Sequence, residues 1–246
     1  VWAWTDDTHM ALSIVETLHT YGCVNQEALI KAFAKRYKED SLRGYSQATS
    51  SLLRKAYHRT DWQEASASLF GSGSYGNGAA MRVAPVGGFF ADDPVRAAKE
   101  AQLSAVLTHA HPEGQAGAIA IAVAASIVAS GNKIEGRALI ATTMEFVPDS
   151  ETRQKIETSL DIPQNELLVA IDRLGTGTNF SAQDTVPFCL WSAAFNLESF
   201  EEAMWWTVKG MGDCDTTCAI VGGIVALAAK SLPAEWMKRR EPLPEI

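Results

Sequence analysis

The chain has 246 residues, of which 47% are hydrophobic and 20% are charged, as in a folded globular protein and unlike a disordered one. Its formal net charge of −8 argues against a surface that coats nucleic acid or an acidic membrane. Four cysteines are too few for a disulfide scaffold, so we expect a reducing, cytoplasmic setting. The longest apolar run, residues 116–129, is too short to cross a bilayer and predicts a buried helix.

Helical periodicity dominates the chain, beginning with Met10, Ile14 and Leu18 on one face of a first helix. Further helices are expected at residues 27–37, 46–58, 94–108, 114–129, 135–146, 151–160, 164–174, from near 187 onward, 199–209, 215–230 and 234–239. The start near Pro187 is chosen because proline suits a first helical turn. Residues 66–90 lose the periodicity where glycines cluster and are expected to be irregular. Since strand alternation is lacking, the sequence predicts an all-α fold of about ten helices in a single domain, residues 1–246.

The first acidic motif, Thr5-Asp6-Asp7-Thr8, opens the first predicted helix. Thr and Asp are ordinary N-caps, because their oxygens accept the free N–H groups of a helix start. Two adjacent carboxylates exceed what a cap needs, and a divalent cation would relieve their repulsion. The motif lies close to Val1, where chains tend to fray, so we expect the domain to lack its N-terminal segment.

The second acidic motif, residues 212–217, contains Asp213, Asp215 and Thr216 and opens the helix expected at 215–230. It too has the composition of a cap, but two such helix starts together would form an oxygen cage suited to Mg²⁺ or Mn²⁺. Within the helix, Gly222 and Gly223 would allow close packing against a neighbour.

A zinc site is the competing interpretation of the same segment. It would use the thiols of Cys214 and Cys218 with His109 or His111. The two cysteines are one helical turn apart, but the sequence offers no second cysteine pair and no paired histidines at zinc-finger spacing. The oxygen site is therefore favoured over zinc.

Residues 71–82, named the glycine loop here, alternate glycine with Ser74, Tyr75 and Asn77. The glycines would let backbone N–H groups approach an anion, and Tyr75 offers a flat face to a base or a ribose. The pattern matches neither a Walker loop nor a dinucleotide-binding fingerprint, so a plain flexible loop remains the alternative. His109, near a predicted helix C-terminus, is more often structural in such a place, although Thr108 beside it leaves room for a substrate hydrogen bond.

These motifs, in this order and spacing, resemble those of the ADP-ribosylglycohydrolase family, which includes the dinitrogenase reductase-activating glycohydrolase-like enzymes. The resemblance covers nearly the whole chain and implies a compact multi-helix domain whose active site lies at helix N-termini and one glycine-rich loop. It implies a binuclear Mg²⁺ centre, with Mn²⁺ as the alternative, held by Thr5, Asp6, Asp7, Asp213, Asp215 and Thr216. It implies that ADP-ribose contacts Ser74, Tyr75, Gly76, Asn77, Gly78 and His109.

By this resemblance the chain is a metal-dependent hydrolase that cleaves the glycosidic bond between the distal ribose of ADP-ribose and a protein side chain, a polymer or an O-acetyl group. Asp6, Asp7 and Asp215 are the catalytic candidates. The family's general acid or base precedes the Thr-Asp-Asp run, so we expect it upstream of Val1. The glycine loop resembles the branch that acts on serine-linked, polymeric or O-acetyl ADP-ribose, whereas residues 109–112 resemble the arginine-linked branch.

A non-catalytic ADP-ribose binder or an immunity protein on the same fold is the alternative, and a crystallin-like structural protein is another. Each would be expected to lose the aspartates, because uncompensated carboxylates facing one another destabilise a fold. All four are present here, which favours the enzyme. The expected partner is ADP-ribose or an ADP-ribosylated protein, with no nucleic acid and no membrane, and the expected state is a monomer.

Overall fold

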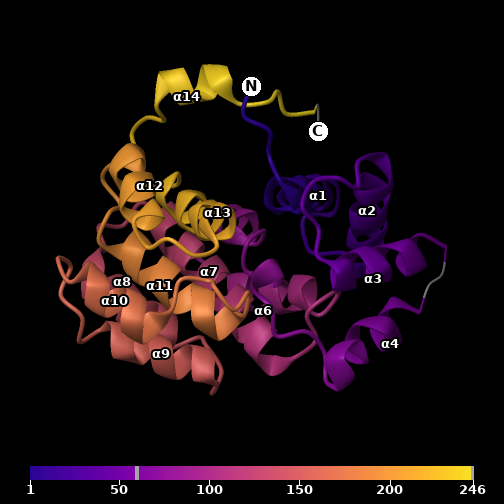
Figure 1. The fold of residues 1–246 in the computed structure, drawn as a ribbon, viewed down its shortest axis with the longest axis horizontal. Coiled ribbons are helices and arrows are strands. Elements are labelled where there is room, and N and C mark those ends of the chain that lie inside the picture. Colours follow the sequence, from indigo (N-terminus) through magenta and orange to yellow (C-terminus); the bar gives the residue numbers. More distant parts are fainter. Residues whose placement is uncertain (59–60, 245–246) are drawn as a thin grey trace.

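The computed structural model describes residues 1–58 and 61–244 and confirms the all-α prediction (Figure 1). Within these residues there are fourteen α-helices, two short 3₁₀ helices (Leu69–Gly71 and Asn77–Ala79) and no β-strand. The first seven α-helices are α1 (Asp6–Tyr21), α2 (Gln26–Glu39), α3 (Gln47–His58), α4 (Trp62–Ala67), α5 (Ala84–Phe89), α6 (Pro94–Ala105) and α7 (Pro112–Ala129). The other seven are α8 (Gly136–Met144), α9 (Glu151–Ser159), α10 (Leu167–Leu174), α11 (Ala182–Ala194), α12 (Phe200–Val208), α13 (Cys214–Val225) and α14 (Ala234–Arg239).

Helix α7 forms the centre of the molecule, in contact with α5, α6, α8, α9, α11 and α13. Every residue from 116 to 128 is buried, as the apolar run predicted. The complete helix has 18 residues and is long and apolar enough to cross a membrane, but 72% of that window is buried inside the fold. Such burial is typical of a core helix, whose apolar residues face neighbouring helices on all sides.

The other helices fall into two halves around this centre. In Figure 1, α1 to α3 lie on one side and α8 to α12 on the other, while α14 lies above α12 and α13. The two ends of the chain meet beside α14, where Trp2 N–H donates to the Arg239 carbonyl (2.7 Å) and Glu241 N–H donates to the Trp2 carbonyl (2.8 Å).

The stretch expected to be irregular, residues 66–90, is more ordered than predicted. Its last part forms α5 despite Pro85, Gly87 and Gly88. The reason is tertiary: a Cβ atom on Gly87 would lie 2.2 Å from the Ala122 carbonyl oxygen of α7, so only glycine allows this close approach. Contact with α7 therefore outweighs the low helix propensity of the segment.

The start of α11 was also predicted wrongly. The helix begins at Ala182, and Pro187 lies inside it. A tertiary contact anchors this earlier start, because Ala182 N–H donates to the carbonyl of Tyr75 in the glycine loop (2.9 Å). An interior proline gives up one helical hydrogen bond, and here the long-range contact and the burial of the helix outweigh that loss.

Candidate active site

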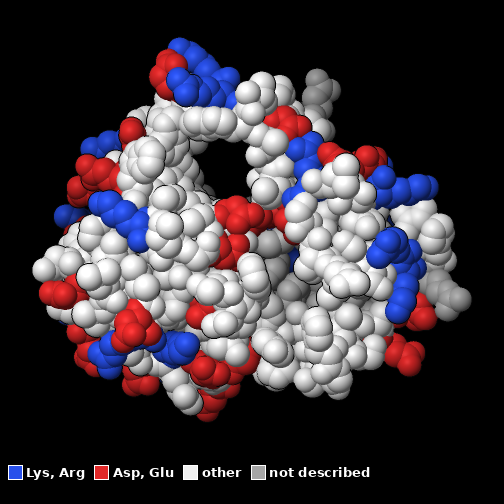
Figure 2. All heavy atoms as spheres, viewed as in Figure 1, with Lys and Arg blue, Asp and Glu red and all other residues white. Residues whose placement is uncertain are grey.

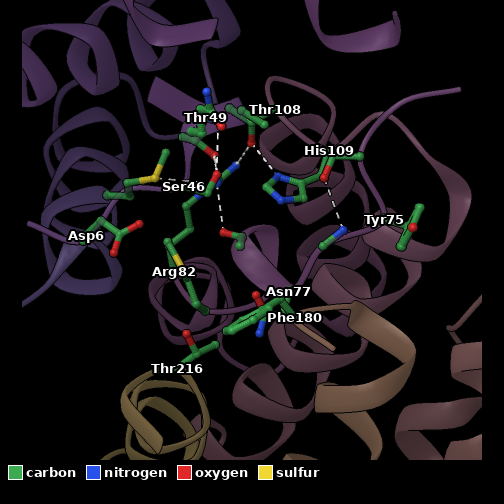
Figure 3. Close-up of a pocket in the computed structure, with 18 of the residues that line it drawn as sticks. Asp6, Ser46, Thr49, Tyr75, Asn77, Arg82, Thr108, His109, Phe180 and Thr216 are labelled. Atoms are coloured by element: carbon green, nitrogen blue, oxygen red, sulfur yellow. Dashed lines mark hydrogen bonds between the residues drawn. The ribbon is translucent and has the colours of Figure 1, made fainter. Parts of the chain in front are cut away.

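A cavity of about 980 Å³ lies between the two halves and gathers most of the residues that the sequence singled out. Its walls come from the starts of α1 and α13, the glycine loop, the segment before α7, the start of α3 and the segment before α11. The lining side chains with polar groups include Asp6, Ser46, Gln47, Thr49, Ser74, Tyr75, Asn77, Arg82, Thr108, His109, Asn179, Asp213, Asp215 and Thr216. Figure 2 shows acidic side chains gathered in the hollow between the halves, and Figure 3 shows the pocket from within.

Neither acidic helix start uses its side chain as a cap. In the described part of the chain, Thr5 and Asp213 occupy the N-cap positions of α1 and α13 without making a side-chain capping bond. The Thr5 hydroxyl donates to the carboxylate of Asp7 (2.5 Å). The simple capping interpretation therefore does not explain these oxygens.

The carboxylates of Asp6, Asp7, Asp213 and Asp215, named the carboxylate cluster here, are electrostatically linked across the two helix starts. Burial and the charges of Asp7 and Asp215 raise the pKa of Asp6 to about 7. Burial and the Asp215 charge raise the pKa of Asp7, against the hydrogen bond from Thr5. Burial and the neighbouring Asp215 raise the pKa of Asp213 to about 6. Holding these groups ionised at neutral pH costs free energy that a bound cation would recover.

One buried oxygen of the cluster lacks a partner in the described part of the chain. Asp7 is only 3% exposed, and its Oδ1 is buried without a hydrogen-bond donor among residues 1–58 and 61–244. Buried carboxylate oxygens are normally satisfied, so this atom fits a metal ligand. Thr5 and Asp7 lie outside the cavity lining, whereas Asp6, Asp213, Asp215 and Thr216 line it.

The donor set is hard and made of oxygen. In the described residues no three His, Cys, Asp or Glu side chains converge closely enough to hold a metal ion by themselves. A cation here would therefore need threonine hydroxyls or waters as additional ligands. Mg²⁺ sites in proteins usually combine a few carboxylates with water in this way. The zinc alternative gains no support: His109 Nδ1 is hydrogen-bonded to Thr108, and His111 accepts the backbone N–H of Glu113 at the start of α7.

The N-terminal and C-terminal segments together position Asp6. Its backbone N–H donates to the carbonyl of Arg43 (2.8 Å). The Arg43 guanidinium in turn binds both carboxylate oxygens of Glu241 (2.6 and 2.7 Å) and lies over the ring of Trp4, 3.7 Å from its centroid. Residues from three distant parts of the sequence thus hold the start of α1.

The glycine loop is ordered by the far side of the cavity. Gly76 forms an isolated bridge with Ser181, and Asn77 N–H donates to the Phe180 carbonyl (3.0 Å). The Asn77 amide donates to Asp213 (2.7 Å) and to Thr185 (3.1 Å). The glycines matter because a Cβ on Gly78 would lie 2.9 Å from the His109 ring. The plain flexible-loop interpretation does not describe this segment.

Several cavity residues escaped the sequence analysis, and two of them are aromatic. Phe70 and Phe180 line the cavity with Tyr75, and their side chains are 71% and 66% exposed. Both also have positive φ (54°), an uncommon conformation for aromatic residues that clusters at functional sites. The available signal was their position beside glycine-rich segments, at residues 71–82 and 175–179.

Comparison with known proteins shows the family to which this chain belongs. The sequence profile of the ADP-ribosylglycohydrolase family matches residues 1–245. The chain belongs to the ADP-ribosylglycohydrolase family. This match confirms the resemblance on which the expected ligand sets were based.

Individual relatives of this family member agree with the assignment. The human ADP-ribosylhydrolase ARH3 is 29% identical over 97% of this chain and 74% of its own length. An uncharacterized protein of Archaeoglobus fulgidus is 27% identical over 99% of this chain and 78% of its own length. A solved structure, an ADP-ribosylglycohydrolase-related protein complex, superposes with a TM-score of 0.71 at 23% identity, covering 97% of this chain and 76% of that one. At that identity the superposition supports the fold.

Proposed function

We propose that this ADP-ribosylglycohydrolase family member is a Mg²⁺-dependent hydrolase. It cleaves the glycosidic bond between the distal ribose of ADP-ribose and a protein side chain, a polymer or an O-acetyl group. The observation that carries the proposal is the carboxylate cluster: two acidic helix starts, unused as caps, with raised pKa values for Asp6 and Asp213 at one cavity. Family membership supplies the substrate class.

The proposed metal ligands are Thr5, Asp6 and Asp7 on one side, and Asp213, Asp215 and Thr216 on the other. Bound Mg²⁺ would polarise ribose oxygens and lower the pKa of a water molecule. The carboxylates then serve to hold the reacting sugar and water in one geometry, a contribution that can supply several kcal/mol of barrier reduction. Asp6, Asp7 and Asp215 remain the catalytic candidates.

The glycine loop provides the proposed binding surface for the rest of the ligand. Ser74, Gly76, Asn77 and Gly78 line the cavity and are the proposed diphosphate segment. Because the amide and backbone N–H groups of Asn77 already have acceptors in the protein, Asn77 serves by ordering this segment. Tyr75, Phe70 and Phe180 offer exposed aromatic faces at the same cavity, suited to stacking on a planar ring. His109 supplies a further polar contact.

The test is calorimetric titration with ADP-ribose, in Mg²⁺ and again in EDTA, for the wild type, Asp215→Asn and Asp161→Asn. We expect Mg²⁺-dependent binding by the wild type and by Asp161→Asn, because Asp161 is exposed and is not among the residues that line the cavity. Asp215→Asn should keep its fold, but its affinity for ADP-ribose in Mg²⁺ should be as low as in EDTA. Binding by the wild type that is as strong in EDTA as in Mg²⁺ would remove the metal site from the proposal.

Turnover is measured separately, on ADP-ribose joined through serine, arginine, a polymer and an O-acetyl group. Hydrolysis of one linkage that requires Asp215 would identify the substrate. Mg²⁺-dependent binding without hydrolysis of any linkage, by this chain and by a form extended upstream of Val1, would contradict the enzyme and leave a non-catalytic ADP-ribose binder.

A further inference from the structure

Thr108 lies between two buried side chains of the cavity wall (Figure 3). Arg82 Nη2 donates to the Thr108 hydroxyl oxygen (2.9 Å), and that oxygen is 2.7 Å from His109 Nδ1. A guanidinium can only donate, so the threonine oxygen is the acceptor in the first bond. The hydroxyl oxygen could accept a second bond as well, but its own proton has no acceptor other than His109 Nδ1 among residues 1–58 and 61–244, so the hydroxyl donates the second bond and Nδ1 accepts it. A neutral imidazole that accepts at Nδ1 carries its proton on Nε2.

Arg82 is fixed in this arrangement. It is fully buried, and it also donates to the carbonyls of Gly78 (2.9 Å) and Ser104 (3.1 Å). Its guanidinium lies over the ring of Phe33, 4.7 Å from the centroid. Burial lowers the pKa of Arg82 to about 9, which leaves the group charged at neutral pH. The Arg82 guanidinium therefore stays in place and remains a charged donor to Thr108 at neutral pH.

His109 Nε2 faces the glycine loop. A Cβ atom added to Gly76 or Gly78 would lie 3.2 or 3.0 Å from Nε2. Among residues 1–58 and 61–244 Nε2 has no hydrogen-bond partner, although His109 lines the cavity and is 5% exposed. Burial and the nearby Arg82 charge lower the pKa of His109 to about 3, in keeping with a neutral ring.

We propose that Thr108 is a positioning residue: held by Arg82, it fixes His109 as a neutral imidazole whose Nε2–H is presented to an acceptor oxygen of the ligand beside the glycine loop. The ligand atom recognised there is an oxygen of a phosphate or of a ribose. A phosphate oxygen only accepts hydrogen bonds, and a ribose oxygen accepts them readily. His109 accordingly binds and orients the ligand and does not transfer a proton. This inference rests on the proposed function for the identity of the ligand.

The first test reads the tautomer directly in the ligand-free protein. Side-chain ¹⁵N NMR of the wild type, with His109→Gln to assign the signal among five histidines, should show a protonated Nε2 and an unprotonated Nδ1 for His109. A protonated Nδ1 in the wild type would overturn the proposal. This measurement needs neither ADP-ribose nor turnover, so it is independent of the proposed function.

The second test separates the hydroxyl from the shape of Thr108. Thr108→Val keeps the volume and removes the hydroxyl, whereas Thr108→Ser keeps the hydroxyl. We expect Thr108→Val to give a mixed tautomer and to weaken ADP-ribose binding by about tenfold, the scale of one hydrogen bond to a charged group. Thr108→Ser should retain the wild-type tautomer and affinity.

An unchanged tautomer and affinity in Thr108→Val would contradict the role of Thr108. If Thr108→Val does not fold, the wild-type spectrum and Thr108→Ser still decide, because a changed tautomer in the serine variant would also contradict it. If the wild type fails to bind ADP-ribose, the proposed function fails, while the tautomer measurement continues to test the positioning role.

Discussion

The side-chain amide of Asn77 donates a 2.7 Å hydrogen bond to the carboxylate of Asp213. This bond joins the glycine loop to the carboxylate cluster, across 136 residues of sequence. The two parts of the candidate active site, one proposed to hold the metal and one proposed to hold the ligand, are therefore in direct contact. A change in either part should be felt in the other.

Asn77→Ala should weaken binding of both Mg²⁺ and ADP-ribose, each by about tenfold, because a hydrogen bond to a charged group contributes about 1.5–3 kcal/mol. Calorimetry of each ligand measures this. The matched control is Thr185→Val, which removes the second acceptor of the same amide (3.1 Å) but leaves Asp213 bonded. A loss of ADP-ribose affinity with unchanged Mg²⁺ affinity would show that the bond does not couple the two parts.

Asp6→Asn should stabilise the metal-free protein while removing its stabilisation by Mg²⁺. The folded-state pKa of Asp6 is raised to about 7 from an ordinary 3.8 by burial and by neighbouring carboxylates. The folded state therefore binds more protons than the unfolded state between these values, and the stability linked to this group falls as pH rises through about 7. Removing the charge should raise the free energy of unfolding at pH 8 by about 1–2 kcal/mol.

Thermal melts at pH 5 and pH 8, with and without Mg²⁺, measure this effect. For the wild type we expect a larger Mg²⁺-induced rise in melting temperature at pH 8, because protons compete for the cluster at pH 5. The Asp161→Asn protein is again the control and should behave as the wild type does. A Mg²⁺-induced shift that Asp6→Asn retains in full would exclude Asp6 as a ligand.

Gly223→Ala and Gly222→Ala should differ sharply although the residues are neighbours in α13. A Cβ on Gly223 would lie 2.6 Å from the Cβ of Ala84 in α5, whereas a Cβ on Gly222 would make ordinary contacts at 3.5 Å or more. We expect Gly223→Ala to lower the free energy of unfolding by about 1–3 kcal/mol through overpacking. Gly222→Ala should be neutral or stabilise by up to about 1 kcal/mol, as in an ordinary helix interior. Chemical denaturation measures both, and equal effects would contradict the close contact of α5 with α13.

Tyr75→Ala and Phe180→Ala should weaken ADP-ribose binding more than they lower thermal stability. Both side chains are about half exposed or more, so truncation leaves no core cavity, but it removes a face on which a ring would stack. We expect a loss of affinity of about tenfold for each, by calorimetry. Phe89→Ala, an exposed aromatic residue outside the cavity lining, should leave binding unchanged. A larger effect on the melting temperature than on the affinity for ADP-ribose would indicate that Tyr75 and Phe180 have a structural role.

The sequence by itself determined the helical class, the buried character of α7 and the family. Helix periodicity and motif order can be read from the sequence. Met10, Ile14 and Leu18 were therefore enough to predict α1, and four motifs were enough to identify the resemblance to the ADP-ribosylglycohydrolase family. The positions of Asp6 and Asp213 at helix starts could likewise be predicted, because their residue types favour such starts.

Only the tertiary structure decided how these parts meet. The start of α11 depends on a bond from Ala182 to Tyr75, and α5 exists because Gly87 fits against α7. The tautomer of His109 depends on Arg82, 27 residues away in sequence, and Phe180 reaches the cavity through the bridge of Gly76 with Ser181. The physical reason is common to all four cases: each depends on a hydrogen bond or steric contact between segments that are distant in sequence. Local propensity and periodicity carry no information about such contacts.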